Sequence, residues 1–191
     1  MLILLALLSS FQAPAGACAY DRQQMLALDL RAFDQDMDGG WRALSRREGC
    51  TLAAADLIRD YRHSRRLSDT ILYWHEGQLR ASAGQTEPAI ALFEQSRKNP
   101  DDGFGWNSYV DATIAFLRRD RPALLAARDA LARLPMPAGF APVDTEGRPL
   151  QIRWPMNMDI VDAFVACFGR SYSEAYGGAC RTLAPGNRPE R

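Results

Sequence analysis

The spacing of apolar residues predicts a chain made almost entirely of helices. In Tyr20–Phe33 and Leu52–Arg66, apolar side chains recur every three or four positions, and charged side chains occupy the positions between them. The same spacing predicts further helices over 41–47, 69–83, 87–99, 106–119, 122–134 and 157–168. We therefore predict an all-α fold of seven or eight helices arranged in antiparallel pairs.

Glycine and proline mark where these helices end. Gly84 stands directly after one of them, Gly49 stands two residues after another, and Pro100 follows a third. Residues 135–155 hold five prolines and two glycines, so we predict an extended connection there, with 150–154 pairing briefly as a strand. We expect residues 183–191 to be a flexible tail.

Two consecutive helix pairs, at about 69–100 and 103–135, repeat one pattern. In each pair the first helix is led by aromatic residues and the second opens with a Pro-Ala pair, at Pro88-Ala89 and again 34 residues later at Pro122-Ala123. A weaker copy lies at about 41–66. A period of about 35 residues with two helices per unit is typical of helical-hairpin solenoids. The helix predicted over 122–134 also carries a face of small side chains that allows a close approach of another helix: Ala123, Ala126, Ala127 and Ala130.

These units resemble the tetratricopeptide repeat (TPR) family. The unit at 69–100 carries the small and aromatic positions of that family at Gly77, Ala89, Phe93 and Ser96. The next unit keeps Ala123, Ala130 and Pro135 but has Asp111 in place of the glycine and Ala127 in place of the aromatic residue. The first unit keeps only Gly49, Ala54 and Ile58. The resemblance implies one domain over 18–182: a short TPR-like α-solenoid of stacked hairpins with extra N- and C-terminal helices.

Similar proteins hold peptide segments of their partners on the inner helices, so the resemblance implies interaction and not a reaction. The densest polar and aromatic patch on the expected inner helices comprises Trp74, His75, Gln78, Asn107 and Asp111. Stacking of the two hairpins would bring both halves of this patch together. We therefore predict a groove there that binds a protein or peptide partner.

A hydrolase is the alternative, with Glu76 or Asp111 as the acid and His75 as a helper. Neighbouring residues on a helix point about 100° apart, so His75 and Glu76 do not easily reach one substrate atom. Glu76 and Arg80 also have the spacing of an ion pair on one helix face.

A weak calcium-binding module is a further alternative. Asp34, Asp36 and Asp38, followed by glycine, match the opening of an EF-hand loop. The match then fails, because Arg42 stands at the ninth position and Ser45 stands where a bidentate glutamate is needed. Apart from this candidate, we expect no metal and no cofactor.

The start of the chain predicts export. Residues 1–12 carry no charged side chain and are almost all apolar, but they are too few to cross a membrane. Ala15-Gly16-Ala17 fits the pattern that a signal peptidase cleaves, so we predict a signal peptide over 1–17 and a periplasmic or secreted protein. A lipoprotein anchored through Cys18 is the minor alternative.

Four cysteines fit an oxidising compartment. Three pairings are open, and local spacing favours Cys18–Cys50 together with Cys167–Cys180. The formal net charge is zero, which gives no electrostatic case for nucleic acid. The sequence as a whole predicts a TPR-like scaffold for a protein or peptide partner in the bacterial cell envelope.

Overall fold

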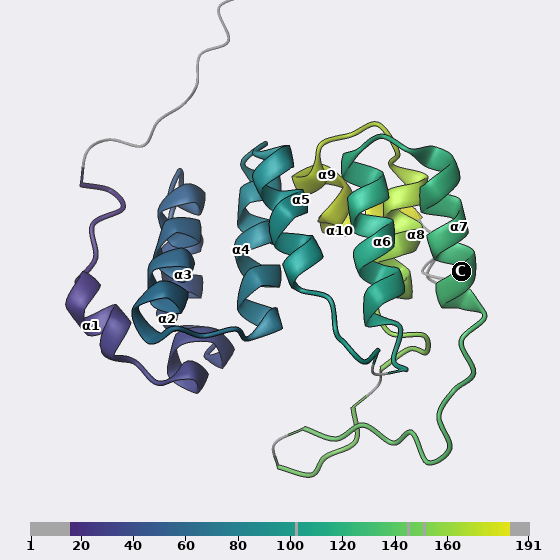
Figure 1. Ribbon diagram of the computed structural model, residues 1–191, viewed down its shortest axis with the longest axis horizontal. Coiled ribbons are helices and arrows are strands. Elements are labelled where there is room, and N and C mark those ends of the chain that lie inside the picture. Colours follow the sequence, from purple (N-terminus) through teal and green to yellow (C-terminus); the bar gives the residue numbers. More distant parts are fainter. Residues whose placement is uncertain (1–15, 102, 145, 151, 184–191) are drawn as a thin grey trace, which may run out of the picture. The chain divides into compact units, whose positions relative to one another are not determined.

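The computed structural model describes residues 16–101, 103–144, 146–150 and 152–183. The regular elements of this part of the chain are helices, with no strand among them (Figure 1). They form two compact units that meet in sequence at Leu67 and Ser68. The single domain over 18–182 that the resemblance implied stays a prediction. The all-α prediction is confirmed. The stacking of the unit at 41–66 on the unit at 69–100 stays a prediction.

The N-terminal unit packs three short helices around one long helix. Its elements are α1 (Arg22–Ala27), η1 (Arg31–Gln35, a π-helix), α2 (Gly40–Ser45) and α3 (Thr51–Arg65). The ring of Phe33 stacks on that of Tyr61 at 3.6 Å between centroids, and both side chains are fully buried. The disulfide Cys18–Cys50 ties the segment before α1 to the start of α3, as the spacing predicted.

The predicted helix Tyr20–Phe33 is divided into two pieces, α1 and η1. The Tyr61 hydroxyl donates a hydrogen bond of 2.8 Å to the carbonyl oxygen of Leu28, and a carboxylate oxygen of Asp29 accepts from the N–H of Ala32 at 2.8 Å. These bonds serve backbone groups that would otherwise pair within one continuous helix. The break therefore comes from a partner on α3 that apolar spacing does not reveal.

Two helical hairpins begin the C-terminal unit. The first is α4 (Thr70–Ser82) with α5 (Thr86–Gln95), and the second is α6 (Trp106–Leu117) with α7 (Arg121–Ala132). Gly77 lets the first pair approach closely, since a Cβ atom there would lie 2.8 Å from a ring carbon of Phe93. The predicted arrangement of helical hairpins is confirmed.

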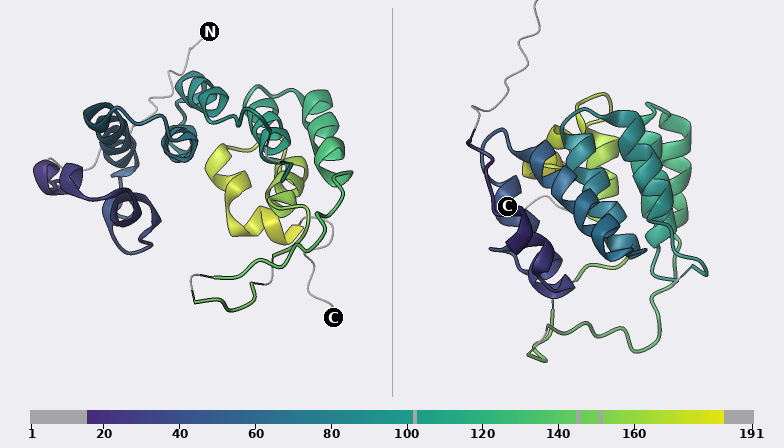
Figure 2. Two further views of the ribbon diagram at one scale, coloured as in Figure 1. Left: turned by 60° about the horizontal axis from the view of Figure 1, so that its bottom comes forward. Right: turned by 60° about the vertical axis from the view of Figure 1, so that its left-hand side comes forward.

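Three further helices pack on these hairpins: α8 (Met158–Ala166), α9 (Tyr172–Tyr176) and α10 (Gly178–Leu183). Helix α8 packs against α6 and α7, α9 packs against α4, and α10 packs against α8 (yellow in Figure 2). The disulfide Cys167–Cys180 links the end of α8 to α10, which confirms the second predicted pair. The hairpins thus share one hydrophobic core with the C-terminal helices.

The connection from α7 to α8 is extended, as predicted. Its turn is held by an isolated bridge between Val143 and Pro149, and the described part of 150–154 forms no strand. At its base, Trp154 packs edge-on against Phe140 at 5.0 Å between ring centroids. The indole of Trp154 donates a hydrogen bond of 3.0 Å to the carbonyl oxygen of Leu134. These contacts anchor both ends of the connection to the end of the second hairpin.

Over the described residues, no helix has the length and apolar character that crossing a membrane requires. The predicted signal peptide lies outside the described residues except for Gly16 and Ala17, and the expected tail lies outside them from residue 184 onward.

Candidate functional site

Trp74, the leading residue of the predicted groove, lies in the hydrophobic core. Its side chain is 3% exposed. Its indole packs on Phe93 at 4.6 Å, on Tyr109 at 4.7 Å and on Trp106 at 4.9 Å between ring centroids. Trp74 therefore joins α4, α5 and α6, and a side chain so deeply buried does not contact a partner.

Helix α9 packs against α4 and helix α8 packs against α6, the two helices on which the predicted groove was placed. Gln78 lies beside the hydroxyl of Tyr172, which is buried and has no hydrogen-bond partner in good geometry. The hydroxyl of Tyr109 is buried in the same way, close to Tyr172 and Tyr176. Burial raises the pKa of Tyr109 and of Tyr172 well above the usual value. The inner face of these hairpins is thus occupied by the chain's own C-terminal segment.

Asn107 uses its side chain to hold the loop between the two hairpins. Its Oδ1 accepts from the backbone N–H of Lys98 at 3.0 Å, and its Nδ2 donates to the carbonyl oxygen of the same residue at 2.9 Å. This two-point contact replaces a backbone pairing where the chain has no helix. We assign Asn107 a structural role, and its amide is engaged within the protein.

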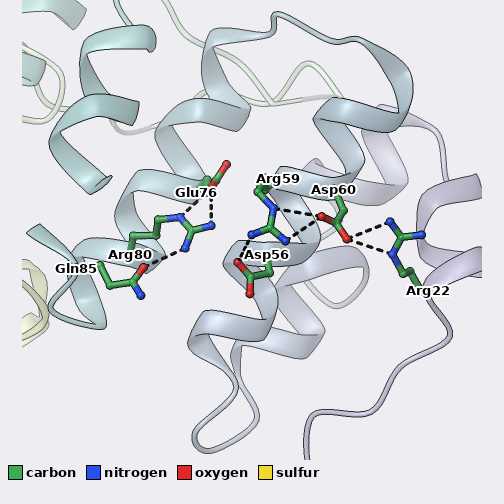
Figure 3. A network of polar contacts seen from close by, with 7 residues as sticks. All are labelled: Arg22, Asp56, Arg59, Asp60, Glu76, Arg80 and Gln85. Carbon is green, nitrogen blue, oxygen red and sulfur yellow. Dashed lines mark hydrogen bonds and ion pairs between the residues drawn. The ribbon is translucent and has the colours of Figure 1, made fainter. Parts of the chain in front are cut away.

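The two acids of the alternative hydrolase form ion pairs with different arginines. Glu76 is 2% exposed and accepts from Arg80 at 2.8 Å, while Arg80 also donates to Gln85 at 3.0 Å (Figure 3). Asp111 binds Arg97 at 2.7 Å. His75, on the same helix as Glu76, is half-buried. Both carboxylates are thus engaged by arginines, and the hydrolase alternative stays a prediction.

The second network in Figure 3 belongs to the N-terminal unit. Asp60 accepts from Arg22 at 3.1 Å, and Arg59 bridges Asp60 at 3.0 Å to Asp56 at 2.9 Å. Burial alone would raise the pKa of Asp60, but the hydrogen bonds from the two arginines hold it below its usual value. The network fastens α1 to α3, and its partly exposed pairs are of the kind that contribute about 1 kcal/mol or less each.

The three aspartates of the calcium candidate do not converge. Asp34 is fully buried and accepts a 2.8 Å hydrogen bond from the indole of Trp41. Asp38 pairs with Arg46 at 3.0 Å, and Asp36 accepts from the backbone N–H of Asp38 at 2.9 Å. Among the described residues, no three acidic, histidine or cysteine side chains form a group able to hold a metal ion. Asp34 serves the core beside Trp41, so the calcium hypothesis is dropped.

Of the predicted partner-binding residues, Asp111 lines a surface groove. This groove, hereafter the α5–α7 groove, runs between α5 and α7 with α6 beneath it and has a volume of about 420 Å³. Its deepest side chains are Ile114, Ala115 and Ala127, which are at most 8% exposed. The wall on α7 is formed by the exposed residues Ala123, Ala126 and Ala130. The small-residue face predicted from the sequence is therefore one wall of an apolar groove.

The two ends of the α5–α7 groove carry different charged groups. At one end Arg97 lies between Glu94 at 2.6 Å and Asp111 at 2.7 Å, so two carboxylates surround one guanidinium. The hydrogen bond that Arg97 donates to Glu94 is the largest cause of the raised pKa of Arg97. At the other end, Arg118 is exposed and forms no ion pair within the described chain. The neighbouring Asp120 caps α7 by accepting from the N–H of Ala123 at 2.9 Å.

Sequence reasoning missed Arg97 and Arg118. Arg97 meets Asp111 only because the first hairpin folds against the second, and no local pattern announces that pairing. Arg118 stands in the turn Arg118–Arg121, where three arginines accompany one aspartate. That cluster of charged residues, next to the small-residue face of α7, was the sequence signal that could have indicated this end of the groove.

Comparisons with known protein families, with curated proteins and with solved structures find no match to this chain.

Proposed function

We propose that this protein is an exported, TPR-like scaffold that binds a segment of a protein or peptide partner in the bacterial cell envelope. The observation that carries the proposal is the α5–α7 groove, whose apolar wall of alanines is exposed while its ends are charged. Apolar grooves rimmed by polar residues are typical of protein-interaction surfaces. The two disulfides support the location, because such bonds persist mainly in oxidising compartments.

The position of the groove differs from the one that the TPR resemblance implies. There the inner helices hold the partner, whereas here α8 and α9 cover α6 and α4. The groove of this protein lies instead between α5 and α7. Recognition without catalysis fits this surface, because its carboxylates are already paired or serve as a helix cap.

The test compares partner capture from envelope extracts by three proteins: the wild type, Ala126→Trp and Ala132→Trp. Ala126 lines the groove, and Ala132 is an exposed alanine on the same helix that does not line it. Both exposed sites tolerate the larger side chain within about 0.5 kcal/mol of stability, so binding is read separately from folding.

We expect the wild type and Ala132→Trp to retain the same protein, and Ala126→Trp to lose it. Equal retention by all three proteins would contradict the proposed function at this groove.

A further inference from the structure

The proposal below rests on the proposed function and concerns what occupies the α5–α7 groove. The middle of the groove offers apolar side chains only, from Ile114, Ala115, Ala126 and Ala127. The backbone groups beneath them belong to the middle of α6 and α7 and are paired within those helices. An extended segment crossing this stretch would bury its own N–H and C=O groups without partners, which is costly. A helical segment avoids this cost, because its backbone N–H and C=O groups are already paired within the helix.

The wall on α7 has the spacing that a helix requires. Ala123, Ala126, Ala127 and Ala130 stand three or four positions apart and so share one face of α7. Their small side chains allow a second helix to approach at the short end of the usual range of axial distances, about 8–10 Å. Helix α5 contributes Glu94 to the opposite wall, and Arg97, two residues beyond the end of that helix, completes it.

The charged ends set the polarity of the occupant. Asp111 lies on α6 and Arg118 is the C-cap of that helix seven residues later, which corresponds to about 10 Å along the helix. The end at Glu94, Arg97 and Asp111 has a surplus of one negative charge, and the opposite end has the exposed guanidinium of Arg118 beside the carboxylate of Asp120 that caps α7. A helix lying along α6 therefore gains from an acidic side chain at the Arg118 end and a basic side chain two turns away.

The helix dipole selects one direction of the chain. Acidic residues stabilise a helix near its N-terminus, and basic residues stabilise it near its C-terminus. The end at Arg118 thus takes the N-terminal part of the occupant, which runs antiparallel to α6 as α5 and α7 do. We infer that the groove binds an amphipathic helix of a partner, with small apolar residues facing α7 and an acidic residue seven positions before a basic one.

The experiment is a selection of random peptides of about 15 residues, long enough to form a helix, displayed on phage against the protein with both disulfides intact. The affinity of the selected peptides is then measured for the wild type, for Ala126→Trp and for Ala132→Trp, which serves as the matched control. We expect the selected peptides to be helix-forming and to carry an acidic residue seven positions before a basic one. Their affinity should fall about tenfold or more in Ala126→Trp and stay unchanged in Ala132→Trp.

Charge reversal then tests the direction. Arg118→Glu should weaken the selected peptides by about two- to fivefold, and exchanging their acidic residue for lysine should restore the binding. Arg133→Glu changes an exposed arginine beyond the groove and should have no effect.

Selection of proline-rich or extended peptides, or of peptides with the basic residue first, would overturn the inference while leaving the proposed function standing. If neither a captured protein nor any peptide distinguishes the wild type from Ala126→Trp, the proposed function fails as well.

Discussion

Replacing Trp74 by alanine should destabilise the fold strongly and leave partner binding unchanged. The indole is 3% exposed and contacts three other aromatic rings at 4.6–4.9 Å between centroids. Truncating a buried tryptophan to alanine costs about 3–5 kcal/mol, because the cavity left behind closes only in part. A domain of this size has a total stability of about 5–15 kcal/mol, so the variant should still fold but unfold at a temperature lower by about 10 °C or more.

Urea unfolding followed by far-UV circular dichroism measures this loss, since the fluorescence of the removed indole does not enter that signal. Leu125→Ala is the control, because Leu125 on α7 is 38% exposed and its truncation should cost about 0.5 kcal/mol or less. Partner capture is compared in the cold, where both variants are folded. A stability loss below about 1 kcal/mol for Trp74→Ala, together with lost capture, would refute the burial argument and return Trp74 to a binding surface.

Three further predictions concern stability. Tyr172→Phe removes a buried hydroxyl that has no hydrogen-bond partner and should add about 1 kcal/mol of stability at neutral pH. Burial raises the pKa of Tyr172, so the wild type loses stability as pH rises above about 10, where the tyrosine of the unfolded chain ionises first. Denaturant titrations at neutral pH and above about pH 10 should therefore show a smaller loss of stability in the variant than in the wild type. Gly40→Ala places a Cβ 2.0 Å from a backbone oxygen at a φ of +50° and should cost more than about 2 kcal/mol by the same titration, whereas Gly84→Ala, at a φ of +78° with open space, should cost about 1 kcal/mol. Replacing Cys18 and Cys50 by serine opens a loop of 32 residues and should cost about 3.5 kcal/mol of stability in the chain-entropy model. Thermal unfolding measures this loss, and an unchanged unfolding temperature would contradict the stabilising role of the disulfide.

The local features of the fold could be predicted because neighbouring residues determine them. Apolar spacing predicted the helices of both hairpins, and α9 begins at a capping box whose two residues, Ser171 and Glu174, stand three positions apart in the sequence. The cysteine pairs followed from proximity along the chain, since each pair closes a modest loop.

The parts that could not be predicted depend on contacts between distant segments. Periodicity shows that one face of α4 is apolar, but it does not reveal that α9, a hundred residues later, covers that face. Trp74 was therefore assigned to a groove when it belongs to the core. Asp111 does line a groove, but on the side of α6 that faces α5 and α7, where its partner is Arg97.

The most direct test of the central claim is an NMR titration of alanine methyl groups with a peptide selected against the groove. We predict shift changes at Ala123, Ala126 and Ala130, which line the groove, and none at Ala81 or Ala163, which lie in the core shared with the C-terminal helices. Changes confined to Ala81 and Ala163, with the alanines of α7 unaffected, would show that the partner displaces the C-terminal helices from the inner face and would contradict this account.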